Sequence, residues 1–173
     1  MMAEKIIYTT EISTPLGEMI AGVTTAGLCL LEFTDRIRLQ TQKDQLEKKL
    51  QAVLQPGYNA YSAQVEEELA AYFSGRRQTF SIPLVVPGTT FEQSVWQQLQ
   101  KIPYGETCSY KDLALILKNE KAVRAVGTAN GRNRIAIIIP CHRVIGANGS
   151  LTGYAGGMER KQRLLNLERD YGF

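Results

Sequence analysis

The chain has 173 residues, of which 44% are hydrophobic, and its formal charge is +3, so it is expected to fold around a core and not to be disordered. Its single histidine excludes histidine-rich metal sites, and its three scattered cysteines fit neither a disulfide framework nor a Cys-x-x-Cys metal site. No run approaches the ~20 apolar residues of a membrane span and no signal peptide is expected, so a reducing cytosol is the expected setting.

The first half of the chain is predicted to be a small α/β domain over residues 1–82. Alternating apolar residues predict three strands of an antiparallel sheet, over residues 5–12, 19–24 and 28–33. Apolar positions at helical spacing predict two helices, over residues 40–54 and 64–73. A strand meander followed by helices is typical of an α+β fold.

The second half, residues 87–173, is predicted to be a separate, mainly helical domain. Two prolines and a glycine in residues 82–88 mark the boundary, and the charge balance changes across it. Residues 1–86 carry 8 basic and 10 acidic groups, whereas residues 87–173 carry 12 basic and 7 acidic groups. The predicted helices cover residues 91–99, a pair that begins after Ser109, and residues 158–168.

The short helical pair is a candidate DNA-binding element. Ser109 and Asp112 have the spacing of a capping box, with inner positions expected at Leu113, Ile116 and Leu117, and a second helix is predicted over residues 122–129. Two short helices joined by a tight turn are typical of a helix-turn-helix. The second helix carries small side chains, which suit the minor groove of DNA, about 6 Å wide. Tight helix packing is the alternative explanation.

Residues 118–143 contain six basic residues and one acidic residue, Glu120. Such a basic stretch is the pattern of a phosphate-binding surface. An ordinary solvated surface explains the charges equally well, so the stretch alone leaves both interpretations open.

A cysteine and the only histidine are adjacent in Pro-Cys-His-Arg, residues 140–143, after a strand-like apolar run at 135–139. Cys141 could be a small buried hydrophobe. However, Arg143 and a neighbouring imidazole favour the thiolate, which is the nucleophilic form. A carboxylate is expected to orient the ring of His142, and the sequence leaves Glu168, Glu106 and Asp112 open for that role.

The segment 131–146, GRNRIAIIIPCHRVIG, resembles the active-site signature of the methylated-DNA–protein-cysteine methyltransferases, the O6-alkylguanine-DNA alkyltransferases. The resemblance covers nearly all of residues 87–170 in order, including Val95-Trp96, Ile102-Pro-Tyr-Gly-Glu106 and Gly153-Tyr-Ala-Gly-Gly157. It extends more loosely to the N-terminal half, through Thr14-Pro-Leu-Gly-Glu18.

The resemblance implies repair of DNA by irreversible transfer of a methyl or other alkyl group from O6-alkylguanine, and from O4-alkylthymine, to Cys141. Each molecule would react once, after flipping the base through the minor groove. The implied fold is α+β, with a winged-helix-like helix-turn-helix in the C-terminal domain. The implied partner is double-stranded DNA, the protein is expected to be a cytoplasmic monomer near the nucleoid, or nuclear in a eukaryote, and no cofactor or metal is expected.

The resemblance also assigns roles to individual residues. Catalysis is assigned to Cys141, His142, Glu168 and Tyr110. DNA binding is assigned to Arg124, Tyr110, Ala125, Ala129, Asn130, Gly131 and Arg132. The substrate pocket is assigned to Val144, Tyr154, Ala155 and Trp96. Asn133 is assigned as the hinge that ties the helix-turn-helix to the reactive loop.

Two departures from the family pattern lead to further expectations. Arg134 stands where many members have proline, which is expected to add a charge beside the DNA-binding face. The N-terminal half has only Cys29 and no histidine, so no zinc site is expected there.

Two other classes of protein remain as alternatives. A cysteine hydrolase with a Cys-His-Glu triad would turn over many times. A plain DNA-binding regulator would prefer one sequence and would tolerate loss of Cys141.

Overall fold

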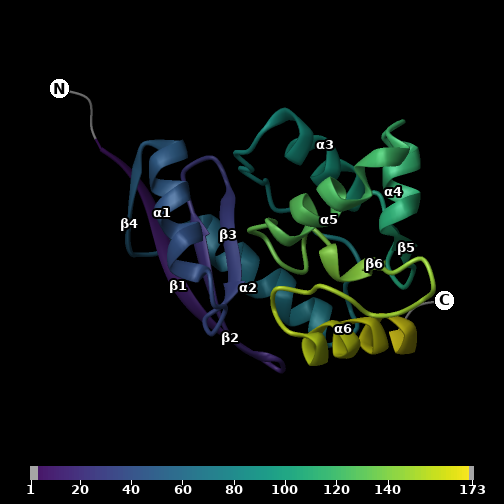
Figure 1. Ribbon diagram of the computed structural model, residues 1–173. Helices are drawn as coiled ribbons and strands as arrows, with labels where there is room; N and C mark the ends of the chain where they lie inside the picture. The colour runs from purple at the N-terminus through teal and green to yellow at the C-terminus, as the bar shows by residue number, and fades with distance from the viewer. Residues whose placement is uncertain (1–3, 172–173) are drawn as a thin grey trace. The chain divides into compact units, whose positions relative to one another are not determined.

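The computed structural model describes residues 4–171, which form two compact units that divide between Pro87 and Gly88 (Figure 1). The first unit is built on a four-stranded sheet with the order β3-β2-β1-β4. The predicted α+β class is confirmed, as is the antiparallel meander of the first three strands. The strands are β1 (Lys5–Thr14), β2 (Gly17–Val23), β3 (Leu28–Phe33) and β4 (Ala52–Pro56).

Strand β4 was not expected, because the helix predicted over residues 40–54 ends early. Helix α1 (Leu39–Leu50) ends at Gln51, which adopts the left-handed conformation. The chain then extends, and Ala52–Pro56 pairs in parallel with Lys5–Thr9 of β1. Val53 and Leu54 therefore belong to the sheet and not to the helix. Because β4 is parallel to β1 while the other pairs are antiparallel, the sheet is mixed.

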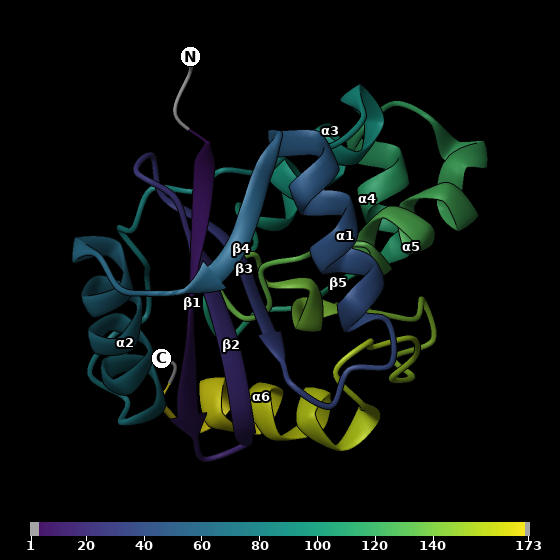
Figure 2. The same ribbon diagram turned by 90° about the vertical axis from the view of Figure 1, so that its left-hand side faces the viewer.

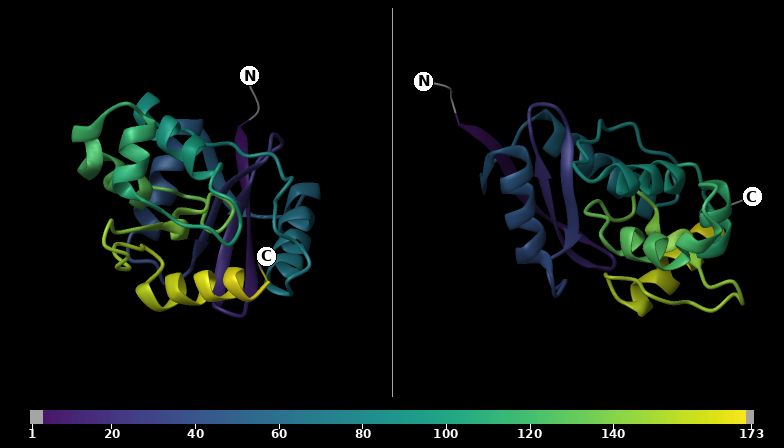
Figure 3. Two further views of the ribbon diagram at one scale, coloured as in Figure 1. Left: turned by 90° about the vertical axis from the view of Figure 1, so that its right-hand side faces the viewer. Right: turned by 45° about the horizontal axis from the view of Figure 1, so that its top comes forward.

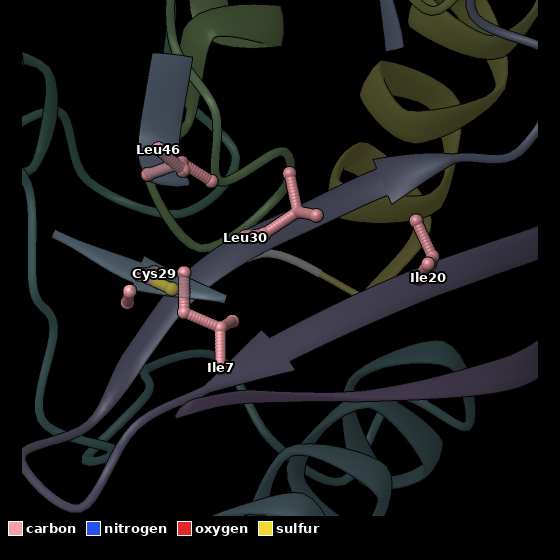
Figure 4. Packing of buried hydrophobic residues seen from close by; sticks show 6 residues of the cluster. Ile7, Ile20, Cys29, Leu30 and Leu46 are labelled. Atoms are coloured by element: carbon pink, nitrogen blue, oxygen red, sulfur yellow. The ribbon is translucent and has the colours of Figure 1, made fainter. Parts of the chain in front are cut away.

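The core of the first unit lies between α1 and one face of the sheet. Ile7, Ile20 and Leu30 project from three neighbouring strands, and Leu46 of α1 is fully buried with them (Figure 4). Helix α2 (Ala60–Phe73) packs against β1 and β2 (Figure 2). It begins earlier than predicted, because Asn59 and Ser62 form a capping box in front of it.

The second unit contains four α-helices within the described residues. They are α3 (Thr90–Leu99), α4 (Tyr110–Ile116), α5 (Val123–Gly131) and α6 (Met158–Tyr171). Two short parallel strands accompany them, β5 (Cys108–Ser109) and β6 (Val144–Ile145). No helix within residues 4–171 has the length and apolar character needed to cross a bilayer.

The predicted helical pair is present as α4 and α5, which pack against each other (Figure 3). Ser109 caps α4 by accepting a bond from the N–H of Asp112, whose carboxylate accepts one in return from the N–H of Ser109. Leu113 is buried as expected, but Ile116, expected on the inner face, is 56% exposed. Helix α4 has only seven residues, so its last turn extends beyond the packed face.

The strand-like run at residues 135–139 is not a strand, which corrects the sequence prediction. Its five residues are buried, but Ile137 has a φ of +72°, and the N–H groups of Ile138 and Ile139 bond to carbonyls within the run. These local bonds use the backbone groups that a sheet partner would need. The run is a buried, irregular loop whose apolar side chains fill the core of the second unit.

Candidate active site

Cys141 opens a single turn of 3-10 helix, Cys141–Arg143, in a light-green segment that lies between α5 and α6 (Figures 1 and 3). The thiol is nearly buried, with the residue 7% exposed. Asn133 fixes it, because its Nδ2 donates to Cys141 Sγ at 3.2 Å. The same amide group donates to the carbonyls of Ile139 at 2.8 Å and Ile135 at 3.2 Å, while Asn133 Oδ1 accepts from the N–H of Ile135 at 2.9 Å. One buried side chain therefore fixes both ends of the irregular loop and its sulfur.

His142 is fully buried and pairs with Glu168 of α6, with 2.6 Å between Nε2 and Oε2. Of the three carboxylates that the sequence left open, the structure brings Glu168 to the ring. Glu106 is exposed, and Asp112 caps α4. Burial would raise the pKa of Glu168, but the hydrogen bonds from His142 and Arg143, together with the positive charge of Arg143, outweigh it and hold the pKa well below its usual range.

The charge state of this pair fixes the tautomer of His142. An ionised Glu168 can only accept hydrogen bonds, so Nε2 must carry the proton. Burial lowers the pKa of His142 despite the opposing effect of Glu168, and the ring is therefore neutral at neutral pH. Its Nδ1 is then a free acceptor, buried and without a hydrogen-bond partner among the described residues. The site thus contains a poised base beside the thiol.

Arg143 anchors the same carboxylate from the other side. Its Nε donates to Glu168 Oε1 at 2.8 Å, one terminal nitrogen donates to Oε2 at 3.1 Å, and the other donates to the carbonyl of Ile102 at 2.7 Å. The guanidinium also lies 5.7 Å from the centre of the Tyr104 ring. A bidentate guanidinium fixes a carboxylate in position as well as in charge, so Glu168 is held rigidly against His142.

Lys161 of α6 is a buried member of the site that the sequence analysis missed. The residue is fully buried, and its Nζ donates to the carbonyls of Val144 at 2.6 Å and Thr152 at 2.8 Å. Its spacing to Leu164 and Glu168, three and seven positions away, places all three residues on the inner face of one helix. That spacing is the signal that could have identified it.

The residues expected to form the base pocket have mixed surroundings. Val144 and Tyr154 are buried, whereas Ala155 is exposed. Tyr110 is half-buried, and its hydroxyl donates to the carbonyl of Thr152 at 3.1 Å. Burial raises the pKa of Tyr110, the hydrogen bond to Thr152 opposes this, and a negative charge at Cys141 raises the pKa further.

Trp96, the fourth residue expected in the pocket, lies instead in the packing between α3 and α5. It is 1% exposed, and its indole N–H donates to the carbonyl of Ala129 at 2.9 Å. Arg134 is 4% exposed and places its guanidinium carbon 5.9 Å from the centre of the Trp96 ring. Arg134 therefore does not add a charge to an exposed DNA-binding face, and that expectation is wrong.

The residues expected to bind DNA are only partly exposed. Arg124, Ala125 and Arg132 are exposed, and Gly131 is half-buried. Ala129 and Asn130 are each 2% exposed, because they face the inside of the unit. The exposed face of α5 therefore includes Arg124, Ala125 and Thr128, whereas Val126, Ala129 and Asn130 face the core of the unit.

Within residues 4–171 no three His, Cys, Asp or Glu side chains gather as metal ligands would. Cys108 is half-buried, and burial together with the charge of Asp112 raises its pKa to about 11. The Cys108 thiol therefore stays protonated at neutral pH. This makes it a poor nucleophile.

Comparison with known proteins places this geometry in a family. Residues 90–170 match the family described as 6-O-methylguanine DNA methyltransferase, DNA binding domain. The constitutive methylated-DNA–protein-cysteine methyltransferase of Bacillus subtilis is 46% identical over 166 residues, which cover 94% of this chain and 95% of that protein. A methyltransferase of the same name from Methanosarcina barkeri is 42% identical, with 95% of this chain and 98% of that protein covered.

Solved structures agree with the sequence relatives. The structure of Mycobacterium tuberculosis OGT in complex with DNA has a TM-score of 0.82 and 39% identity, covering 95% of this chain and 94% of that one. The M. tuberculosis O6-methylguanine methyltransferase has a TM-score of 0.81 and 38% identity, covering 96% and 95%. On this identity and coverage, the chain belongs to the methylated-DNA–protein-cysteine methyltransferase family of DNA-repair enzymes.

Proposed function

We propose that this protein repairs double-stranded DNA by moving an alkyl group from O6-alkylguanine to Cys141 Sγ, once per molecule. The observation that carries the proposal is the fixed sulfur: Asn133 Nδ2 holds Cys141 Sγ at 3.2 Å, beside a His142 ring that Glu168 orients at 2.6 Å. A cysteine hydrolase with the same residues would turn over many times, whereas the proposed transfer stops after one reaction per molecule.

Activation of the thiol begins with the neutral His142 ring. Because Nε2–H is committed to Glu168, Nδ1 accepts the thiol proton, through one intervening water. The imidazolium that forms is stabilised by the ionised Glu168, which Arg143 holds in place. Arg143, two positions after the cysteine, adds positive charge near the resulting thiolate.

The transfer step is a single displacement. The thiolate electron pair forms the S–C bond, the C–O6 bond breaks, and its electron pair passes into the guanine ring. Tyr110 donates its hydroxyl proton toward N3 of the departing base, which neutralises the developing charge. A thioether has no reverse path under these conditions, so the molecule is consumed.

The base must leave the duplex to reach a sulfur that is 7% exposed. Arg124 is exposed at the start of α5 and would fill the gap in the base stack, and the small side chain of the exposed Ala125 would allow the helix to approach a narrow groove. We infer that O4-alkylthymine enters the same pocket and that the protein acts as a monomer.

The proposal is tested by incubating the protein with a duplex that contains radiolabelled O6-methylguanine and counting the methyl groups transferred per protein. The expected plateau is one, with the label on the Cys141 peptide. Cys141→Ala should abolish transfer while retaining DNA binding, and Cys108→Ser is the matched control that should react normally. Multiple turnovers, or label on Cys29 or Cys108, would contradict the proposal. The same labelling experiment with an O4-methylthymine duplex tests the second substrate. The elution volume of the protein in size-exclusion chromatography, with and without DNA, tests whether it is a monomer.

A further inference from the structure

Lys161 is a buried cation that the proposed chemistry does not use as a proton donor or acceptor. The residue is fully buried, and desolvation holds its pKa below the ordinary range for lysine. Its Nζ spans two backbone carbonyls, of Val144 in β6 and of Thr152 in the loop before α6, at 2.6 and 2.8 Å. Lys161 therefore joins β6, which directly follows Cys141–Arg143 in the chain, to the loop before α6.

The carbonyl of Thr152 has a second donor, the hydroxyl of Tyr110 at 3.1 Å. A tyrosine hydroxyl has one proton, so it cannot donate to Thr152 and to a base nitrogen at the same time. In the free protein the Tyr110 proton is therefore committed to the backbone. When a base arrives, the hydroxyl must turn away from Thr152 toward the base.

We propose that Lys161 is a positioning residue for Tyr110: by holding the Thr152 carbonyl, it lets the Tyr110 hydroxyl leave that carbonyl for the base at little cost. This inference rests on the proposed function, in which Tyr110 donates to N3 of guanine. Without Lys161, the departure of Tyr110 would leave the Thr152 carbonyl without either of its side-chain donors. With Lys161 present, the carbonyl keeps one fixed donor while the Tyr110 hydroxyl turns to the base.

Neighbouring glycines support the same geometry. Gly153 follows Thr152 with a φ of +62°, and a Cβ at Gly153 would lie 3.6 Å from the Tyr110 hydroxyl oxygen. A Cβ at Gly127 of α5 would lie 3.8 Å from the Tyr110 ring. The tyrosine thus has small neighbours on two sides, which leaves room for its hydroxyl to turn while the ammonium of Lys161 keeps the loop in place.

A double-mutant cycle tests whether Lys161 acts through Tyr110. The rate of reaction with free O6-benzylguanine is measured for the wild type, Lys161→Met, Tyr110→Phe and the double variant, because a free base needs no flipping. Each single variant should lose about tenfold, and the double variant should be within about twofold of the slower single one, because the two residues serve one event. If the two single losses multiply, so that the double variant loses about a hundredfold in rate, Lys161 acts independently of Tyr110 and the inference is overturned.

Alkylation by iodoacetamide separates this role from a direct effect on the sulfur. That reaction needs a reactive thiolate at Cys141 but no proton on a leaving base, so Lys161→Met should react within about twofold of the wild type. A tenfold loss would assign Lys161 to thiolate stabilisation and would overturn the inference. Arg163→Met, an exposed cation on the same helix, is the matched control and should leave both rates unchanged.

Two further variants guard against a folding defect. Lys161→Arg keeps the charge and the donors, so it should recover most of the rate with O6-benzylguanine. If Lys161→Met does not fold, Lys161→Gln, which keeps N–H donors, replaces it in the cycle under the same criterion.

The failure of the proposed function can be distinguished from the failure of the role of Lys161. A wild-type protein that reacts with iodoacetamide but leaves O6-benzylguanine and alkylated duplex untouched contradicts the proposed function. A reactive wild type with multiplied losses contradicts only the role of Lys161.

Discussion

Replacing Asn133 with alanine should destabilise the second unit by about 2–5 kcal/mol. The substitution removes the acceptor for the N–H of Ile135, and that residue is fully buried, so the orphaned donor alone costs about 1–3 kcal/mol. The carbonyls of Ile135 and Ile139 each lose one donor but keep another, from the N–H groups of Ile139 and Cys141 respectively, so each loss costs about 0.5–1 kcal/mol. This sum is a large share of the free energy of unfolding of a typical domain, which is about 5–15 kcal/mol.

The assay is urea unfolding followed by the fluorescence of Trp96, the only tryptophan in the chain, which reports on the second unit. Asn130→Ala is the matched control, because Asn130 is equally buried but its Oδ1 has no partner among the described residues. We expect it to cost less than about 1 kcal/mol. The reasoning fails if Asn133→Ala costs as little as the control, since its bonds would then not hold the loop.

Three further predictions concern charge. Glu168→Gln should slow transfer at pH 7 at least about tenfold. Because the pKa of Glu168 lies well below its unfolded value, the stability that it contributes is fully present above about pH 4.5 and is lost as pH falls below that value toward the folded pKa, so the urea midpoints of variant and wild type should stay apart from pH 7 to 5 and approach each other only below about pH 4.5. Equal transfer rates would remove Glu168 from the site. Arg124→Ala should slow repair of duplex DNA more than reaction with free O6-benzylguanine, whereas equal losses would indicate a folding defect. In the first unit, burial raises the pKa of Glu32 to about 7 despite Arg36, so the stability gained from its protonated form is lost as pH rises through 7. The wild type should lose up to about 3 kcal/mol relative to Glu32→Gln between pH 5 and 8, and parallel pH profiles by circular dichroism would contradict this.

The sequence predicted the parts of the fold that depend on neighbouring residues. Ser109 and Asp112 cap α4 as their spacing predicted, and the three-stranded meander follows from alternation and turns. Cys141 and His142 are adjacent in the sequence, so this part of the site could also be predicted without the fold. Periodicity failed at Val53 and Leu54, because a short apolar segment after a helix reads the same whether the helix continues or a strand begins.

Side-chain contacts that the hydrophobic pattern does not encode decided the remainder of the site. The pattern of residues 135–139 is that of a buried strand, but the amide of the nearby Asn133 bonds to the carbonyls of Ile135 and Ile139 and holds the segment as a loop. The comparison with the family pattern predicted Arg134 beside the DNA-binding face, whereas the ring of Trp96, 38 positions earlier in the chain, provides a buried place for it. Lys161 was missed because buried lysines are rare, and only the position of the two loop carbonyls makes one favourable.

The burial of Arg134 and Arg143 changes how many counterions DNA binding can release. The basic stretch 118–143 contains six cations, but only Lys118, Lys121, Arg124 and Arg132 are exposed. Arg124 is proposed to enter the base stack, which leaves Lys118, Lys121 and Arg132 for phosphate contacts. Three contacts give a slope of about −2.7 for log affinity against log salt, so raising salt fourfold weakens binding about 40-fold, whereas six contacts would weaken it about 2000-fold. The affinity that this stretch contributes should therefore depend much less on salt than its six cations suggest.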